Sequence, residues 1–147
     1  MAWPLVTIMA VLALSNIANY SGMMLALAAT MANTGALFAF LSPVLGWLGV
    51  FITGSDTAAN NLFVPLQYGT ANSVGMEPVL ALGANASGGV AGKMISPQSI
   101  AVACAAVGLA GKESDLFRFT IKHSFILLFI LCLLTFLQSN ILSFMVP

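Results

Sequence analysis

The stretch Thr53-Gly54-Ser55-Asp56-Thr57-Ala58-Ala59-Asn60-Asn61 decides how the rest of this chain is interpreted. Residues 1–55 contain no Asp, Glu, Lys or Arg, so Asp56 is the first charged side chain, and it appears inside a polar segment. An ionisable group among apolar helices is expensive to bury, and such groups usually mark an ion or substrate pathway. The sequence therefore predicts a functional site at Asp56, with a purely structural helix cap as the alternative.

The composition indicates which solvent surrounds this chain. Hydrophobic residues make up 60% of the 147 residues and charged residues only 5%, whereas about a quarter of a soluble domain is charged. We therefore expect an all-α, polytopic membrane protein, because a helix satisfies its own backbone polar groups within lipid. Basic and acidic residues cancel, which argues against a nucleic-acid partner. The two cysteines have no metal or redox spacing, and no cofactor or metal is expected.

The apolar pattern divides the chain into five predicted pieces within one transmembrane region, residues 1–147. Spans are expected at residues 4–31, 78–110 and 124–145, a re-entrant hairpin at 43–67, and an amphipathic segment at 112–122. Each span is long enough to cross about 30 Å of hydrocarbon at about 1.5 Å per helical residue.

Two equal arms around the polar tip suggest the hairpin. Pro43–Thr53 and Thr57–Gln67 each contain eleven residues, which as helices cover roughly 16 Å, about half of the hydrocarbon core. The second arm is also too polar for lipid contact. We therefore predict a re-entrant hairpin with Gly54-Ser55-Asp56 near the membrane midplane. Two conventional short spans, or one long span with a surface loop at Asp56, are the alternatives.

The segment from Asn85 to Lys93 predicts a break in the 78–110 span. It holds three glycines within five residues, which resist helix formation, and Ser96-Pro97 then carries the N-cap and N1 signals of a new helix. A broken transmembrane helix follows from this pattern.

Two predicted helix N-termini meet near the midplane: one helix begins near Thr57 with Ser55 or Asp56 as its cap, and the other begins at Pro97 with Ser96 as its cap. Each presents unpaired N–H donors and about half a positive charge, and Lys93 adds a full one, so together they suit a small carboxylate. Asp56 is expected to be either a proton carrier or the salt-bridge partner of Lys93 in the empty site. The candidate substrate-binding residues are Ser55, Thr57, Asn60, Asn85, Ser87, Gly88, Gly89, Lys93, Ser96 and Gln98.

The segment 112–122 holds most of the charged side chains and is typical of a helix that lies at the membrane interface. Three of the four basic residues lie in it, so the positive-inside rule places it in the cytoplasm. The final span then ends on the outer face, and residue 1 begins on the cytoplasmic side.

Three stretches, Gly46–Thr57, Gly88–Cys104 and Gly111–Arg118, resemble the C-terminal part of the L-lactate permease family. The resemblance covers essentially the whole chain. It implies a multi-pass carrier of the bacterial inner membrane, not an enzyme, that imports L-lactate and related 2-hydroxy acids such as glycolate by symport with protons. Chains of this family are several times longer, so the resemblance also implies a fragment whose missing N-terminal part completes the carrier.

At the superfamily level, the order of hairpin, broken helix and terminal helix resembles one half of an inverted-repeat ion transporter. Polar residues at the hairpin tips of such proteins help to bind carboxylates and coupling ions, and Ser55-Asp56-Thr57 stands at the tip here. The acidic residue departs from the sodium-coupled relatives and is compatible with proton coupling. A sodium-coupled carrier of another small carboxylate and an inactive structural fragment remain alternatives.

A protease function has little support in the sequence. An intramembrane aspartyl protease needs a second carboxylate that shares a proton with the first. Asp115, the only other aspartate, lies in the predicted interfacial segment.

Overall fold

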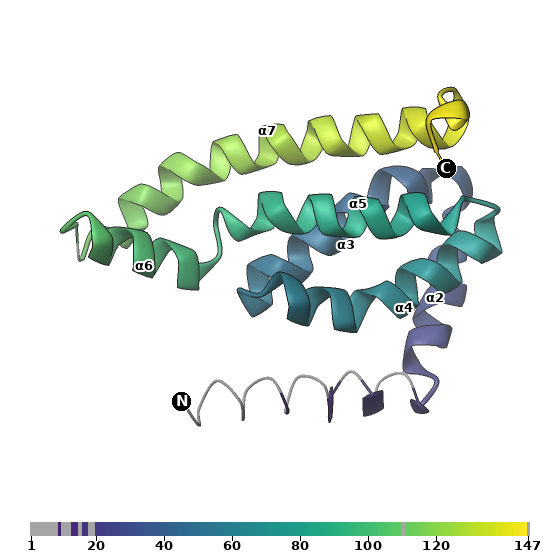
Figure 1. The fold of residues 1–147 in the computed structure, drawn as a ribbon, viewed down its shortest axis with the longest axis horizontal. Coiled ribbons are helices and arrows are strands. Elements are labelled where there is room, and N and C mark those ends of the chain that lie inside the picture. Colours follow the sequence, from purple (N-terminus) through teal and green to yellow (C-terminus); the bar gives the residue numbers. More distant parts are fainter. Residues whose placement is uncertain (1–8, 10–12, 15, 18–19, 110, 147) are drawn as a thin grey trace.

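The computed structural model describes residues 9, 13–14, 16–17, 20–109 and 111–146, and most of these are helical (Figure 1). Much of the predicted span 4–31 lies outside the described residues. The elements are α2 (Met23–Ala32), the 3-10 turn η1 (Gly35–Leu37), α3 (Phe38–Thr53), α4 (Asp56–Val74), α5 (Pro78–Lys93), α6 (Pro97–Ala106), α7 (Glu113–Asn140) and the 3-10 turn η2 (Ser143–Met145). The prediction of an all-α fold is confirmed for this part of the chain.

Helices α3, α4 and α5 pack against one another and form the centre of the molecule. Helix α2 contacts α4, and α7 runs alongside α5 and α3, away from α4 (Figure 1). Within the described residues, two helical segments, Gly35–Thr53 and Glu113–Asn140, are long and apolar enough to cross a membrane. The outer face of α7 exposes Ile126, Ile130 and Leu133, and an apolar face of this kind suits lipid or another protein.

Helices α3 and α4 form an antiparallel hairpin that turns at Gly54 and Ser55 (Figure 1). Gly54 ends α3 with a φ of 65°, a left-handed conformation that glycine adopts without strain. The predicted arm lengths are wrong, because α3 has 16 residues and α4 has 19. At about 1.5 Å per residue the arms cover about 24 and 28 Å, so arm length no longer argues for a re-entrant hairpin.

The predicted break at Asn85–Lys93 is also wrong, because α5 is helical from Pro78 through Lys93. The glycines that suggested a break lie against α3. A Cβ on Gly88 would come within 1.9 Å of the Pro43 carbonyl oxygen, and a Cβ on Gly92 within 2.2 Å of the Trp47 carbonyl oxygen. These glycines therefore allow two helix backbones to touch, as small residues do between membrane helices.

The interruption lies instead at residues 94–96, between α5 and α6. Ser96 begins α6 as predicted: its Oγ accepts a hydrogen bond from the Ser99 N–H at 3.3 Å, and Pro97 occupies the first turn. Helix α6 ends at Ala106, before the predicted end at residue 110, which lies outside the described residues.

Helix α7 joins two pieces that the sequence separated. It is helical without interruption from Glu113 to Asn140, so most of 112–122 is the beginning of the last helix and not a separate interfacial segment. One hydrogen-bonded link fixes this helix to the centre. Trp47 Nε1 donates to Ser124 Oγ at 2.9 Å, and Ser124 Oγ donates to the Ala91 carbonyl oxygen at 2.6 Å.

Replacement of Gly88 by Ala tests the contact between α3 and α5. The new Cβ would meet backbone atoms of Pro43, which cannot rotate out of the way as a side chain can. The two helices must therefore separate. We expect a net destabilisation of about 1–3 kcal/mol, although Ala is otherwise favoured over Gly in a helix by roughly 1 kcal/mol. The measurement is the Tm of the detergent-solubilised protein.

Gly83→Ala is the matched control, because a Cβ at Gly83 on the same helix has no neighbour within 4 Å. That variant is expected to keep or raise the Tm. Equal Tm values for the two variants would show that the fold does not depend on the close contact.

Candidate functional site

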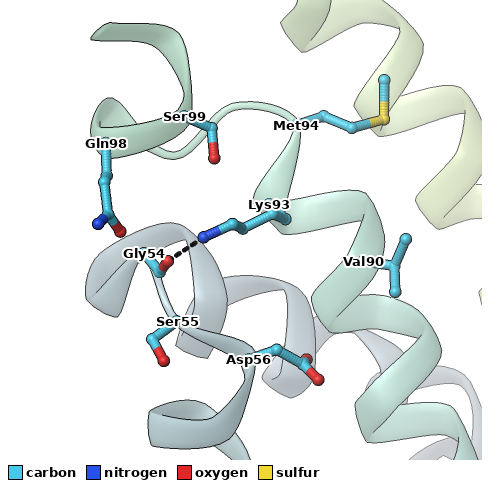
Figure 2. Close-up of a pocket in the computed structure, with 8 residues that line it drawn as sticks. All are labelled: Gly54, Ser55, Asp56, Val90, Lys93, Met94, Gln98 and Ser99. Atoms are coloured by element: carbon cyan, nitrogen blue, oxygen red, sulfur yellow. Dashed lines mark hydrogen bonds between the residues drawn. The ribbon is translucent and has the colours of Figure 1, made fainter. Parts of the chain in front are cut away.

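An open cavity of about 600 Å³ lies where the hairpin tip meets the α5–α6 interruption (Figure 2). The tip, the end of α5 and the first turn of α6 contribute the lining residues Gly54, Ser55, Asp56, Val90, Lys93, Met94, Gln98 and Ser99. Four of them, Ser55, Asp56, Lys93 and Gln98, are residues that the sequence singled out. The fold therefore brings the tip and the start of α6 together, as the sequence predicted.

Two helix N-termini open onto this cavity. Ser55 caps α4, since its Oγ accepts a hydrogen bond from the Ala58 N–H at 3.3 Å, and Ser96 caps α6. Gln98 in the first turn of α6 lies so close to the tip that a Cβ on Gly54 would be 2.7 Å from Gln98 Oε1. The first-turn N–H groups of a helix carry a partial positive charge, so the cavity is suited to a small anion.

Lys93 contributes a full positive charge to the same place. Its Nζ donates a hydrogen bond to the carbonyl oxygen of Gly54, directly after the last turn of α3 (Figure 2). A cation is favoured at a helix C-terminus, where carbonyl groups carry a partial negative charge. The partner of Lys93 is thus the hairpin backbone, and not the Asp56 carboxylate that one sequence interpretation paired with it.

Asp56 begins α4 and lies against α5. A Cβ on Gly89 would be 2.6 Å from Asp56 Oδ1, so the absence of a side chain at Gly89 makes room for the carboxylate. Its other oxygen, Oδ2, accepts a hydrogen bond from Asn60 Nδ2 at 3.3 Å. The carboxylate therefore lies between the cavity and the packed helices.

A series of polar side chains leads from the exposed Asp56 and the half-buried Asn60 into the buried space between α3, α4 and α5. Asn85 Nδ2 donates to Asn60 Oδ1 at 2.7 Å, and Gln67 Nε2 donates to Asn85 Oδ1 at 3.2 Å. Gln67 Nε2 also donates to the Ser42 carbonyl oxygen at 2.8 Å, and Ser42 Oγ donates to Gln67 Oε1 at 2.8 Å. We call these five residues, with Asp56 at one end, the polar series.

Three members of the polar series are almost completely buried: Ser42 and Gln67 are 0% exposed and Asn85 is 1% exposed. Burial of amides is tolerated because they are hydrogen-bonded, and no buried side-chain polar atom in the described part of the chain lacks a partner. The sequence predicted Asn60 and Asn85 as site residues and missed Ser42 and Gln67. The signal for Gln67 was its position in an arm too polar for lipid.

Other predicted residues do not line the cavity in the described structure. Thr57 is exposed, and Ser87 donates to the Gly83 carbonyl oxygen and lines a separate cavity next to α7. Gly88 packs against α3, and Ser96 is buried as the cap of α6. Among the described residues, no group of three or more His, Cys, Asp or Glu side chains is placed to hold a metal ion.

The family model for L-lactate permease matches residues 1–142. This chain belongs to the L-lactate permease family. An L-lactate permease of Bacillus subtilis is 66% identical over 144 residues, which are 98% of this chain and 26% of the relative. An L-lactate permease of Escherichia coli is 56% identical over 147 residues, or 100% of this chain and 27% of the relative.

A glycolate permease of Escherichia coli is 54% identical over 141 residues, which cover 96% of this chain and 25% of the relative. This member of the L-lactate permease family therefore spans about a quarter of the length of the curated relatives it matches. No solved structure matches it. Family membership and the apolar helices of the described residues together indicate a membrane protein.

Proposed function

We propose that this chain forms part of a carrier that imports L-lactate, and related 2-hydroxy monocarboxylates such as glycolate, across the bacterial inner membrane together with protons. The names of the relatives support the substrate class. The observation that carries the proposal is the cavity in which Lys93 and two helix N-termini surround a space beside Asp56.

In this proposal the substrate carboxylate binds between the N-termini of α4 and α6. Lys93 exchanges the Gly54 carbonyl oxygen for a carboxylate oxygen, which forms a stronger, charge-assisted hydrogen bond. Ser55 and Gln98 line the same cavity and offer polar groups to the 2-hydroxyl group of the substrate. This pattern matches transporters in which half-helix N-termini face an anionic substrate.

Asp56 is the proposed proton carrier, because it is the acidic side chain among the residues that line the cavity. A lactate anion that crosses with one proton carries no net charge, which removes most of the penalty for moving a charge through lipid. Asn60 holds one carboxylate oxygen in place, and the other lies next to Gly89.

The position of Lys93 supports proton coupling over sodium coupling. In transporters with discontinuous helices, coupling cations bind at half-helix C-terminal ends and at unwound backbone carbonyl groups. Here the ammonium group of Lys93 contacts the carbonyl oxygen of Gly54 at the end of α3. The ammonium group stays in the same cavity when it turns to the substrate, so its positive charge disfavours a sodium ion beside that carbonyl oxygen.

We further propose that α3 and α4 enter the membrane as a re-entrant hairpin in one half of an inverted-repeat carrier. The ten residues of α6 cover about 15 Å, roughly half the hydrocarbon thickness. Because α6 begins beside the hairpin tip, this length supports a tip near the middle of the membrane. The basic residues near the start of α7 support a cytoplasmic location for the α6–α7 turn. The remaining part of the carrier then covers the open side of the cavity.

Transport experiments require a complete carrier. A suitable one is a chimera in which this chain replaces the matching segment of the Bacillus subtilis relative, purified and reconstituted in liposomes; we call it the chimeric carrier.

The depth of the tip is tested with a cysteine at Ser55 in a chimeric carrier without other cysteines. We expect a small, impermeant maleimide to react through the open cavity, and a large polyethylene-glycol maleimide to be excluded. A cysteine at Gly111, in the α6–α7 turn, should react with both reagents and serves as the control. Rapid reaction of Ser55→Cys with the large reagent would show a surface loop and two conventional spans.

Substitution of Lys93 by Gln tests the role of the positive charge. Gln keeps a polar side chain but loses the charge, and a hydrogen bond to a charged group contributes roughly 1.5–3 kcal/mol. The KM for lactate uptake by the chimeric carrier is therefore expected to rise about tenfold or more. Lys112→Gln removes a charge outside the cavity lining and should leave the KM unchanged. An unchanged KM for Lys93→Gln would show that Lys93 stabilises the fold and does not bind the substrate.

Substitution of Asp56 by Asn tests proton coupling. Asn retains the size of the side chain but cannot release a proton, so accumulation of lactate in response to a pH gradient should be lost. Exchange of labelled for unlabelled lactate, which needs no net proton movement, is expected to persist. Asp115→Asn, at the exposed start of α7, is the matched control. If Asp56→Asn still accumulated lactate against its gradient, Asp56 would not be the proton carrier, and the proton would cross elsewhere in the carrier.

A further inference from the structure

The amide hydrogen bonds from Gln67 through Asn85 and Asn60 to Asp56 all have the same direction, with each N–H donated toward Asp56. The Ser42 carbonyl oxygen can only accept, so the Nε2 of Gln67, and not its Oε1, must face it. The second N–H of that nitrogen then faces Asn85 Oδ1. Asn85 in turn directs Nδ2 at Asn60 Oδ1, which leaves the Asn60 Nδ2 for Asp56.

One backbone carbonyl group in α3 therefore sets the orientation of three amide side chains. An amide placed at random has no preferred end, and only its hydrogen-bond partners decide where the nitrogen lies. Ser42 Oγ reinforces the choice, since it donates to Gln67 Oε1 at 2.8 Å. The result is an N–H donor that faces the carboxylate of Asp56.

We propose that Gln67 is a positioning residue for the proton site: through Asn85 and Asn60, it keeps an N–H donor directed at Asp56. The proposal rests on the proposed role of Asp56 in proton coupling. Gln67 lines no part of the cavity and therefore acts on the substrate site only through its neighbours. Its complete burial also means that it serves neither lipid nor solvent contact.

The orientation matters because an amide group has a hydrogen-bond donor at one end and an acceptor at the other. If the amides were reversed, the oxygen of Asn60 would face an oxygen of Asp56, an arrangement that is stable only with a proton between them. In the observed orientation, three aligned amide dipoles direct their N–H ends toward the carboxylate, and hydrogen bonds in such a series strengthen one another. Gln67 thus keeps a donor, and not an acceptor, in front of the Asp56 carboxylate.

The remaining surroundings of Asp56 contain one other charged group in the described structure. Lys93 on α5 lines the same cavity but bonds to the Gly54 carbonyl group. Val50 of α3 lies against Gly89, beside Asp56, and α6 contributes the uncharged Gln98 and Ser99 to the cavity. The polar series is therefore the main polar contact of Asp56 on the core side.

The test follows the protonation of Asp56 directly, by infrared titration of its carboxyl band in the chimeric carrier. The band is assigned by its loss in Asp56→Asn. Gln67→Met keeps the length and unbranched shape of the side chain but removes all donors. If Gln67 positions the donor, the pH at which the carboxyl band of that variant disappears is expected to differ from that of the parent carrier.

Asn72→Met is the matched control, because Asn72 lies on the exposed side of the same helix and donates to the Tyr68 carbonyl oxygen of its own helix. It should leave the titration unchanged. Ser42→Ala removes a hydroxyl group but keeps the backbone carbonyl group that sets the direction, so its effect should be smaller than that of Gln67→Met. If Gln67→Met fails to fold, Gln67→Asn is used in its place, because its amide group is one carbon shorter and no longer reaches the same partners.

An unchanged Asp56 titration in the Gln67 variant, or an equal shift in Asn72→Met, would overturn the proposal. The infrared readout does not depend on transport. Failure of the parent carrier to move lactate would therefore count against the proposed function, while the titration would still decide the role of Gln67. If Gln67 had a purely structural role, Gln67→Met would lower the Tm without changing the titration of Asp56.

Discussion

The direct backbone contact between α3 and α5 is the constraint on which the rest of the structure depends. Gly46 of α3 approaches the backbone of Asn85, while Gly88 and Gly92 of α5 approach the backbone of α3, each at a distance that a Cβ would not allow. Membrane helices gain little from burying apolar surface, because lipid is equally apolar, and close van der Waals contact takes its place. Glycine is therefore structural at these positions.

This contact also places the chemistry. Because α3 and α5 lie close together, the end of α3 reaches the end of α5, and Lys93 contacts the Gly54 carbonyl oxygen. The interruption at residues 94–96 then directs the first turn of α6 at the hairpin tip. Gly89, one position along α5 from a packing glycine, leaves room for Asp56. Helix packing and the candidate site thus share one glycine-rich segment.

The polar series gives the centre of the protein a second kind of contact. Hydrogen bonds hold Gln67 and Asn85 between three helices and fix the orientation of their amide groups, which apolar packing alone would not do. A buried amide without partners would be unfavourable by several kcal/mol, so the series specifies one arrangement of the three helices. It connects the proposed proton site to a backbone carbonyl group of α3.

The sequence by itself determined the helical class and the cap at Ser96, because composition and capping chemistry are local properties. It left the cap of α4 open between Ser55 and Asp56, and the structure gives Ser55. It also predicted that the hairpin tip, Lys93 and the start of α6 lie together. It misjudged Asn85–Lys93, since glycine has low helix propensity in isolation, whereas here its lack of a side chain permits contact with α3. It also missed Ser42 and Gln67. Only the tertiary structure decided these points, because a packing partner or a hydrogen-bond partner distant in sequence leaves no local pattern.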